Sequence, residues 1–502
     1  MSQTVDQREQ RAESALPRAS ALCSRDTHAS LLETWPGPTL PRVVGRIWET
    51  INSRRQCNYP FLYMNANIDQ VTFSERLQLL HVLRFSEYRH PTELVGDEDA
   101  SETLRALDVI ASCIATGTEG ESFAASLDPT TIPPTIILSK TGPITEEDRK
   151  FISSFLDAFT SSDTHNFRQV FPLLFSRCFA SMKTRMENLY EAARRYLVHH
   201  TALLESYQPL SFKEEFPYFH LLHPNHEDRE FVATFHMLFA DIENVASWPF
   251  HRDSPVHSHY NYTRLHVLSV IIASSRFISV QTERVFSEKT KAVDELKRCL
   301  ERIKEYIGGV NMLIRRSRQV FPDGKIPVRW AGSTSTAVER SVSMPATPWV
   351  ALERLGFNFD IGKQQNIIAQ LPSFELDWQT TCRPRMHAKI AVLRYFHERG
   401  LMPSGRCPIG CSEDCCWCCD QWMGRYNSLY TTRYVASGAS VKIRVDWEMS
   451  GLVSADFFLH EELGSLIKFH KQVTTRRRKR SSTTPPVKNT LQKIEESRED
   501  DV

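Results

Sequence analysis

Apolar residues recur at three- and four-residue spacing through most of the stretch from residue 41 to 321, which predicts a mostly α-helical domain. The pattern is clear in Phe151–Phe159, and Thr145 with the acidic residues behind it is typical of a helix N-terminus. Helical periodicity continues through 166–206, 226–245, 262–278 and 282–318. We find no repeat of fixed length, so the pattern gives no support for a helical solenoid.

From residue 349 the pattern changes to short apolar runs that alternate with helical segments, which predicts an α/β domain over 349–472. Strands are expected at Trp349–Leu355 and Val441–Trp447. Helices are expected at 386–399, 415–426 and 456–470. Residues 322–348 are rich in Pro, Gly, Ser and Thr and predict a linker or an ordered loop. Because a single core stops growing at about 250 to 300 residues, a chain of 502 residues favours two domains.

Both ends of the chain are polar and lack periodicity. Residues 1–40 are expected to form a disordered leader, and residues 473–502 a disordered tail that is first basic and then acidic. The basic run Arg476–Arg480 is typical of nuclear import signals and of solvated tails. The pattern is therefore compatible with a location in the cytoplasm and with one in the nucleus. The chain begins without the apolar run of a secretory signal, and no apolar stretch reaches the roughly 18 residues of a membrane span. We therefore expect an intracellular protein with no membrane partner.

The charge balance and the cysteine content limit which ligands and which kinds of site the chain is expected to have. The 61 basic side chains balance 60 acidic ones, so any contact with nucleic acid must be local. Twelve cysteines without a secretory signal favour a reducing compartment, in which thiols serve as metal ligands, nucleophiles or buried apolar residues. Seven of the twelve lie between Cys382 and Cys419. This clustering points to a metal site in the C-terminal part.

The segment that starts at His387 and the cysteines from Cys411 to Cys419 carry a metal-ligand pattern. A catalytic zinc takes three protein ligands and keeps one open position, and one imidazole with the two thiolates of a C-x-x-C turn supplies such a set. Two intervening residues let both sulfurs converge at the start of a helix, where the positive helix end favours thiolates. A histidine at the start of another helix would face them across a groove.

This arrangement resembles the zinc-dependent nucleobase deaminases, which place H-x-E on one helix and P-C-x-x-C on the next. More narrowly, His387-Ala-Lys-Ile, Ile409-Gly-Cys-Ser and the C-x-x-C are similar to the OTT-type deaminase-like family, which is widespread in fungal genomes. The resemblance covers roughly residues 345–470. It implies a three-layer α/β domain of the cytidine-deaminase type, a Zn²⁺ cofactor, and a nucleotide or nucleic acid as the ligand.

The resemblance, carried over residue by residue, makes His387, Cys416 and Cys419 the zinc ligands. Cys415 and Cys418 form an overlapping C-x-x-C and stay the alternative pair. We prefer the later pair because the residue after Cys416 is a tryptophan, and family members keep an aromatic residue just after the first ligand.

The chain departs from the family's pattern at Lys389, which stands where the motif requires a glutamate. An ammonium cannot accept a proton from metal-activated water, so we expect an impaired enzyme. Glu413 is the alternative proton shuttle of an active hydrolytic deaminase, and a Lys389–Glu413 ion pair across the groove is a further hypothesis. A third interpretation is an interaction scaffold. In it the helical domain binds a protein partner, and Cys411 or Cys407 completes a closed, structural zinc site.

Overall fold

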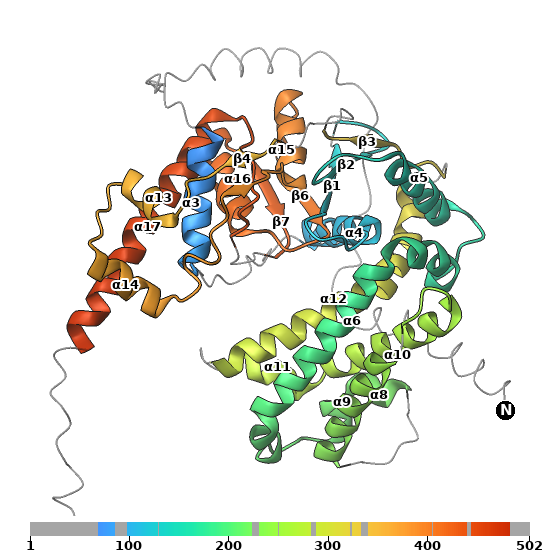
Figure 1. Ribbon diagram of the computed structural model, residues 1–502. Coiled ribbons are helices and arrows are strands. Elements are labelled where there is room, and N and C mark those ends of the chain that lie inside the picture. Colours follow the sequence, from blue (N-terminus) through green and yellow to red (C-terminus); the bar gives the residue numbers. More distant parts are fainter. Residues whose placement is uncertain are drawn as a thin grey trace, which may run out of the picture.

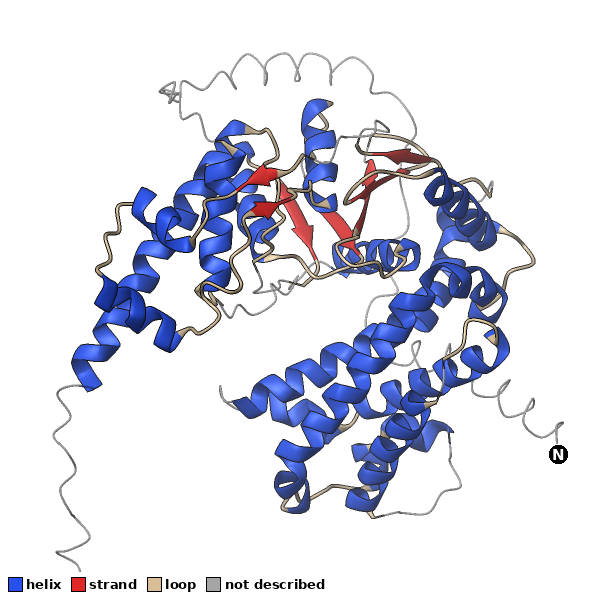
Figure 2. Cartoon of the chain, in the orientation of Figure 1, coloured by secondary structure: helices blue, strands red, loops and turns tan. Residues whose placement is uncertain are grey.

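The computed structural model describes residues 69–85, 98–128, 130–222, 230–248, 250–282, 288–321, 324–332, 340–403, 405–438 and 443–481. The leader predicted over residues 1–40 and the last part of the predicted tail lie outside these ranges. Figures 1 and 2 show a central sheet with helices on both sides and a large helical bundle in the lower part of the view. Within the described ranges, no helix is both long and apolar enough to cross a bilayer.

A five-stranded mixed sheet has the strand order β3-β2-β1-β6-β7. Strands β1 (Phe123–Asp128) and β2 (Thr135–Lys140) pair antiparallel as a hairpin. Strand β6 (Arg406–Cys411) pairs antiparallel with β1, while β7 (Arg433–Ala436) runs parallel to β6 and β3 (Val328–Trp330) runs parallel to β2. The first half of the chain and the C-terminal part therefore build the sheet together.

The β1–β2 hairpin lies within residues 41–321, for which the sequence predicts a mostly α-helical domain and no strand. Its strands contain Phe-Ala-Ala and Thr-Ile-Ile-Leu, short apolar runs that periodicity alone cannot distinguish from buried helix. The runs are continuous because both faces of the sheet are buried: Phe123 and Ala125 belong to the core of the helical bundle, and Ala124 belongs to a second core. The sheet thus separates two cores, and no linker divides them.

The helical bundle confirms the predicted periodic stretches over most of their length. Its main helices are α5 (Glu146–Thr160), α6 (Phe167–Glu205), α9 (Phe231–Ser247), α10 (Pro255–Ala273) and α12 (Glu288–Val320). Short helices α7 (Phe212–Glu215), α8 (Pro217–Leu222) and α11 (Arg276–Thr282) accompany them. The predicted helix start at Thr145 is a capping box, in which the Thr145 hydroxyl accepts from the Asp148 amide and the Asp148 carboxylate accepts from the Thr145 amide.

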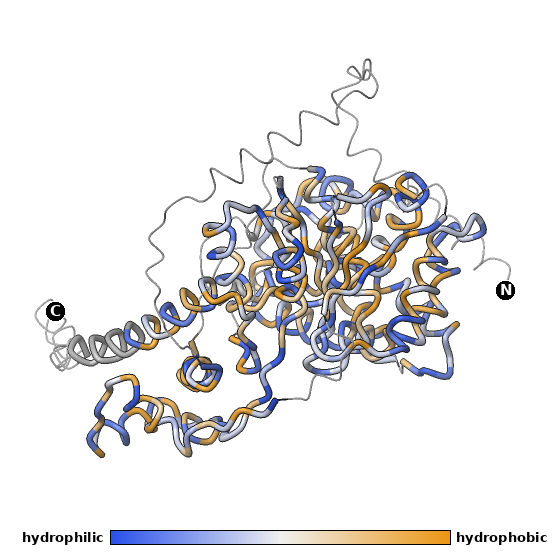
Figure 3. Tube along the Cα trace, turned by 90° about the horizontal axis from the view of Figure 1, so that it is seen from above, coloured by the Kyte–Doolittle hydropathy of each residue, from blue (hydrophilic) through white to orange (hydrophobic). Residues whose placement is uncertain are grey.

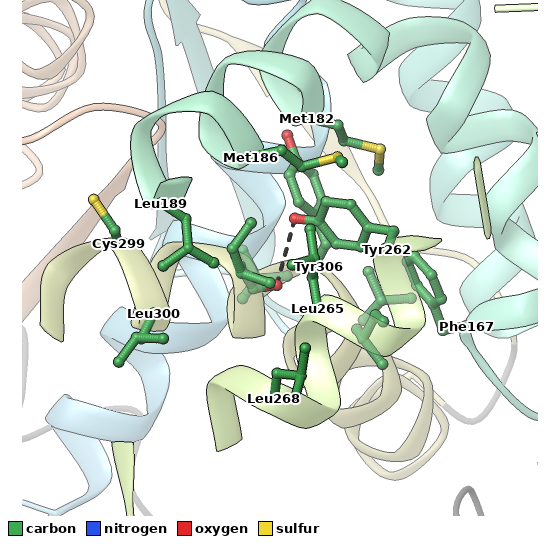
Figure 4. Close-up of a cluster of buried hydrophobic side chains, with 14 of the residues drawn as sticks. Phe167, Met182, Met186, Leu189, Tyr262, Leu265, Leu268, Cys299, Leu300 and Tyr306 are labelled. Carbon is green, nitrogen blue, oxygen red and sulfur yellow. Dashed lines mark hydrogen bonds between the residues drawn. The ribbon is translucent and has the colours of Figure 1, made fainter. Parts of the chain in front are cut away.

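The bundle core lies where α6, α10 and α12 meet (Figure 4). Met182 and Leu189 of α6 lie close to Leu265 of α10 in a fully buried cluster. Two tyrosines are buried there as well, and the Tyr262 hydroxyl donates to the backbone oxygen of Ile303 at 3.4 Å. Each buried hydroxyl needs such an acceptor, because an unpaired one would cost about 1 to 3 kcal/mol. Figure 3 shows the apolar positions gathered toward the interior.

Helices cover both faces of the sheet. Besides the bundle, the described residues form α3 (Gln70–Val82), α4 (Glu98–Ile114), α13 (Pro348–Arg354), α14 (Ile361–Gln370), α15 (Ala388–Glu398), α16 (Trp417–Tyr430) and α17 (Val453–Ser481). Helix α4 packs on β1 and β6 from the side of the bundle, and α15 packs on β1 and β2 from the other side. Helix α16 contacts α15, β7 and α17. A helix–sheet–helix arrangement is the α/β class that the sequence predicts.

Two strand predictions in the C-terminal part are wrong. The segment predicted as a strand over Trp349–Leu355 forms helix α13, because Pro348 suits the first turn of a helix and lacks the amide that a strand would need. In Val441–Trp447, the described residues 443–447 are irregular and make a single bridge to Arg385. A short antiparallel pair, β4 (Val342–Ser343) with β5 (Thr381–Cys382), lies outside the main sheet.

The segments that the sequence predicted as a linker and as a disordered tail also differ from the structure. The described part of 322–348 contains β3, which continues the main sheet, so this stretch is not a linker between separate domains. Helix α17 extends to Ser481, so residues 473–481 of the predicted disordered tail are helical. The side chains of the basic run Arg476–Arg480 lie outside the description, and nuclear import stays a prediction.

Candidate metal centre

The candidate metal ligands lie at the starts of two neighbouring helices. His387 is the N-cap residue of α15, and Cys416 is the N-cap residue of α16, where its sulfur accepts from the Cys419 amide at 3.5 Å. One turn of helix brings Cys419 back beside Cys416. Ligand atoms of His387, Cys416 and Cys419 all lie within 4.8 Å of one another. Within the described ranges, they form the one such group of metal-ligating side chains.

The distances within this group fit a tetrahedral metal. His387 Nδ1 lies 3.2 Å from Cys419 Sγ and 3.4 Å from Cys416 Sγ. Zinc bonds of about 2.0 Å to nitrogen and 2.3 Å to sulfur, at a tetrahedral angle, put nitrogen and sulfur about 3.5 Å apart. The set of one imidazole and two thiols could therefore hold a metal ion with little rearrangement.

The other cysteines of the cluster lie outside this group. Cys415 and Cys418, the alternative ligand pair, are buried beside it but do not join the imidazole. The Cys411 thiol donates to the backbone oxygen of Ile409 at 3.6 Å, and Cys407 lies on β6. The geometry thus favours the pair with Cys416 as the first ligand, and it offers no fourth cysteine for a closed site among the described residues.

Two residues to which the sequence assigned no role contact the ligands from outside. Asp446 Oδ1 lies 3.9 Å from His387 Nε2, the ring nitrogen that points away from the sulfurs. The Trp447 indole donates to Cys419 Sγ at 3.4 Å. Ligating histidines commonly face a carboxylate in this way, which orients the ring. Both residues lie in the segment that the sequence suggested as a strand, but no spacing in it pointed to a ligand contact.

A long-range backbone contact brings these residues to the site. The Arg385 amide donates to the backbone oxygen of Asp446 at 2.7 Å, and the Glu448 amide donates to that of Arg385 at 3.1 Å. On the other side, the Ala388 amide at the start of α15 donates to the Thr141 hydroxyl at 3.1 Å, just after β2. The β1–β2 hairpin, from the stretch predicted as helical, therefore helps to position His387.

The bundle also holds the loop before the cysteine ligands. Arg302 of α12 donates to Asp414 Oδ1 at 2.5 Å, and Arg298 donates to Asp414 Oδ2 at 3.2 Å. These pairs keep the pKa of Asp414 below its usual range although burial acts in the opposite direction. The loop at Asp414 leads directly into Cys415 and Cys416, so the bundle supports the metal group.

The charges of the ligands are coupled. Burial tends to lower the pKa of His387, but the Cys416 thiolate and the Asp446 carboxylate raise it to about 9. Burial tends to raise the pKa of Cys416, yet hydrogen bonds from the neighbouring thiols and the His387 charge hold it well below its usual range. These opposite shifts of the two pKa values favour an imidazolium beside a thiolate when no metal is bound. Metal binding at this group must therefore displace a proton from His387.

The hypothesis of an ion pair between Lys389 and Glu413 across the groove is wrong. Lys389 is only 7% exposed, and its amine lies beside the Cys411 thiol, with no carboxylate partner among the described residues. Glu413 Oε2 instead lies 2.5 Å from Arg444 Nη2. Burial by itself would lower the pKa of Lys389, but negative charge on the cysteines around it, Cys411 foremost, would raise the pKa above its usual value. A lysine in its ordinary state is an ammonium, which donates protons and accepts none.

A small cavity lies between the candidate metal ligands and the charged side chains around them. It is lined by Lys389, Glu413, Arg444 and Asp446 together with the three candidate ligands, and its volume of about 30 Å³ admits a water-sized molecule. A wider groove of about 510 Å³ lies next to it, and Arg444 and Asp446 line both. Arg383 and Arg385 line the groove as well.

Asp108 of α4 lies at the ends of β6 and β7, behind the site. Its Oδ1 accepts from the Cys411 amide and from the Ser437 hydroxyl, each at 2.7 Å. Burial raises the pKa of Asp108 to about 7, although these two hydrogen bonds lower it. The folded state therefore binds the Asp108 proton between about pH 4 and pH 7, where an unfolded chain has released it.

This shift predicts a loss of stability as the pH rises through that window. Between pH 5 and pH 7 the Asp108 carboxyl should account for a fall of about 2 kcal/mol in the free energy of unfolding. Asp108→Asn keeps the oxygen acceptor but cannot ionise, and we expect it to remove that part of the fall. Urea unfolding at the two pH values measures the difference. An identical fall in the variant and the native chain would contradict the assignment.

No family model, no curated protein and no solved structure matches this chain.

Proposed function

We propose that this chain is a zinc-binding protein of the cytidine-deaminase-like type in which hydrolytic deamination is lost. The observation that carries the proposal is the buried amine of Lys389, which lines the same small cavity as His387, Cys416 and Cys419. Zinc at this group would supply Lewis-acid activation of a water molecule. The chain would then need a side chain that accepts a proton, and a protonated amine does not accept one.

The carboxylates around the cavity support the loss of this proton transfer. Glu413, the alternative shuttle, is paired with Arg444. Asp446 faces His387 Nε2, on the far side of the ring from the sulfurs. A carboxylate that is held by a cation is a weaker base, because the neighbouring charge favours its ionised form. An active enzyme that uses Glu413 is therefore the less favoured alternative.

The size of the cavity agrees with this proposal. Pockets that hold small organic ligands measure about 300 to 1,000 Å³, ten times or more the volume of about 30 Å³ found beside the candidate ligands. A nucleobase does not fit there. We place the nucleotide or nucleic-acid ligand of the family in the neighbouring groove of about 510 Å³, where Arg383, Arg385 and Arg444 suit a phosphate. Binding there would leave the base outside the metal cavity.

The experiment combines metal analysis with an assay for released ammonia. We expect the purified full chain to carry about one zinc ion and to release no ammonia from cytidine, adenosine or single-stranded nucleic acid. Zinc-dependent ammonia release that Glu413→Gln abolishes would establish the active-enzyme alternative and overturn the proposal. A chain that takes up no zinc would also overturn it and would leave the interaction scaffold with its protein partner. Lys363→Met, at an exposed helix position, serves as the unchanged control.

A further inference from the structure

Each of the two candidate thiol ligands accepts a hydrogen bond from an N–H group, and the two donors have different origins. The Cys416 sulfur accepts from the Cys419 amide at 3.5 Å, a contact that the first turn of α16 supplies by itself. The Cys419 sulfur accepts from the Trp447 indole at 3.4 Å, across 28 positions of the chain. An indole nitrogen is a donor only, which fixes the direction of this hydrogen bond. Cys419 therefore receives it from a residue outside its own helix.

The Trp447 ring also packs against the third candidate ligand. Its centroid lies 6.5 Å from that of the His387 imidazole, with an angle of 64° between the rings. Trp447 is fully buried, and the Phe73 ring of α3 lies against it at a centroid distance of 5.2 Å. A large ring in a close-packed core has few alternative orientations. Packing and the hydrogen bond therefore both direct the indole N–H at the Cys419 sulfur.

Helix α3, the blue helix in Figure 1, holds the backbone around Trp447. The Gln70 side-chain amide donates to the backbone oxygen of Trp447 at 3.1 Å and accepts from the Met449 amide at 2.9 Å. This pair of contacts resembles one pairing of a β-ladder, although Trp447 lies in an irregular segment. On the other side, backbone hydrogen bonds join the same segment to Arg385, just before α15. Trp447 is thus held between α3 and the residues that lead into α15.

We propose that Trp447 is a positioning residue of the metal centre, whose indole N–H orients the Cys419 sulfur and reduces its electron donation to a bound metal ion. The inference rests on metal binding at the proposed site, but not on the loss of deamination. A metal-bound thiolate keeps lone pairs for a hydrogen bond, and hydrogen bonds to charged acceptors are the stronger ones. Helix α3 lies outside residues 345–470, which resemble the deaminase-like family, so this role extends the metal centre to another part of the chain.

Replacing Trp447 with phenylalanine removes the N–H and keeps a buried aromatic ring. Cobalt in place of zinc reports on the sulfur through its sulfur-to-metal charge-transfer absorption, whose energy falls when the thiolate donates more strongly. We therefore expect this absorption to move to lower energy in Trp447→Phe. The metal affinity should fall about tenfold or more, as is common when a contact that supports a ligand is lost. Spectra at saturating cobalt and competition with a chelator measure the two effects.

Trp422→Phe is the matched control. Trp422 of α16 is equally buried, but its indole donates to Asp456 Oδ1 at 2.9 Å and not to a candidate ligand. This variant also loses one buried N–H, and it should leave the charge-transfer energy unchanged. An unchanged energy in Trp447→Phe would overturn the inference. An equal shift in both variants would overturn it as well, since loosened packing would then explain the change.

The native protein provides a second measurement that needs no variant. With a spin-active cadmium isotope at the site, we expect a spin coupling between the metal and the Trp447 indole proton across the N–H···S hydrogen bond. Contacts with the Phe73 ring identify that proton. Bound cadmium without this coupling would overturn the inference and leave the proposed function intact, even where Trp447→Phe does not fold. A native chain that binds neither cobalt nor cadmium would overturn the proposed function itself.

Discussion

Replacing Cys416 with serine is expected to lower the bound zinc from about one ion per chain to less than about a tenth of that. The substitution removes one of the three candidate ligands. A hydroxyl is a poor zinc ligand, and the remaining imidazole and thiol leave the metal with two protein ligands. Serine is also a good helix N-cap, so α16 should keep its first turn although the thiol is gone. Metal analysis of the purified protein measures the effect.

The overlapping cysteine pair provides matched controls. Cys415→Ser and Cys418→Ser change neighbouring buried thiols of the same segment in the same way, and both should retain zinc. The comparison decides the register of the C-x-x-C motif, because only one of the two pairs meets His387 in the structure. Loss of zinc in the Cys415 or Cys418 variant, with retention in Cys416→Ser, would show that the earlier pair binds the metal.

Replacing Gly410 with alanine is expected to destabilise the fold by about 3 kcal/mol or more. Gly410 lies on β6, where α4 packs directly against the strand. A Cβ atom at this position would lie closer than 3.0 Å to the backbone of Leu107 and Asp108, and backbone cannot rotate away as a side chain does. Helix α4 would have to move off the sheet. This movement would disturb the two hydrogen bonds that Asp108 accepts, from the Cys411 amide and from the Ser437 hydroxyl. The midpoint of urea unfolding measures the loss.

Gly424→Ala is the matched control for this prediction. Gly424 lies within α16 on an exposed position, and a Cβ there meets no atom within 4 Å. Alanine is favoured over glycine in a helix by about 1 kcal/mol, so the variant should be as stable as the native chain or slightly more stable. If Gly410→Ala unfolded at the same urea concentration as the native chain, the close packing of α4 on β6 would be wrong.

The amino-acid sequence by itself determined the features that depend on neighbouring residues. Helical periodicity and the Thr145 capping box are encoded within a few positions, and the structure has helices there. The spacing of Cys416 and Cys419 equals about one helical turn, so their convergence at a helix start follows from local geometry. The replacement of glutamate by Lys389 is equally visible in the sequence.

Only the tertiary structure decided the contacts between distant parts of the chain. The β1–β2 hairpin joins β6 from almost 300 positions away, and its apolar runs match buried helix as well as buried strand. Asp446 and Trp447 reach the ligands through a backbone contact to Arg385 that no periodicity encodes. Glu413 pairs with Arg444 and not with Lys389, because side chains choose partners by proximity in the fold. Strand pairing and loop placement set that proximity, and both depend on which apolar surfaces bury one another.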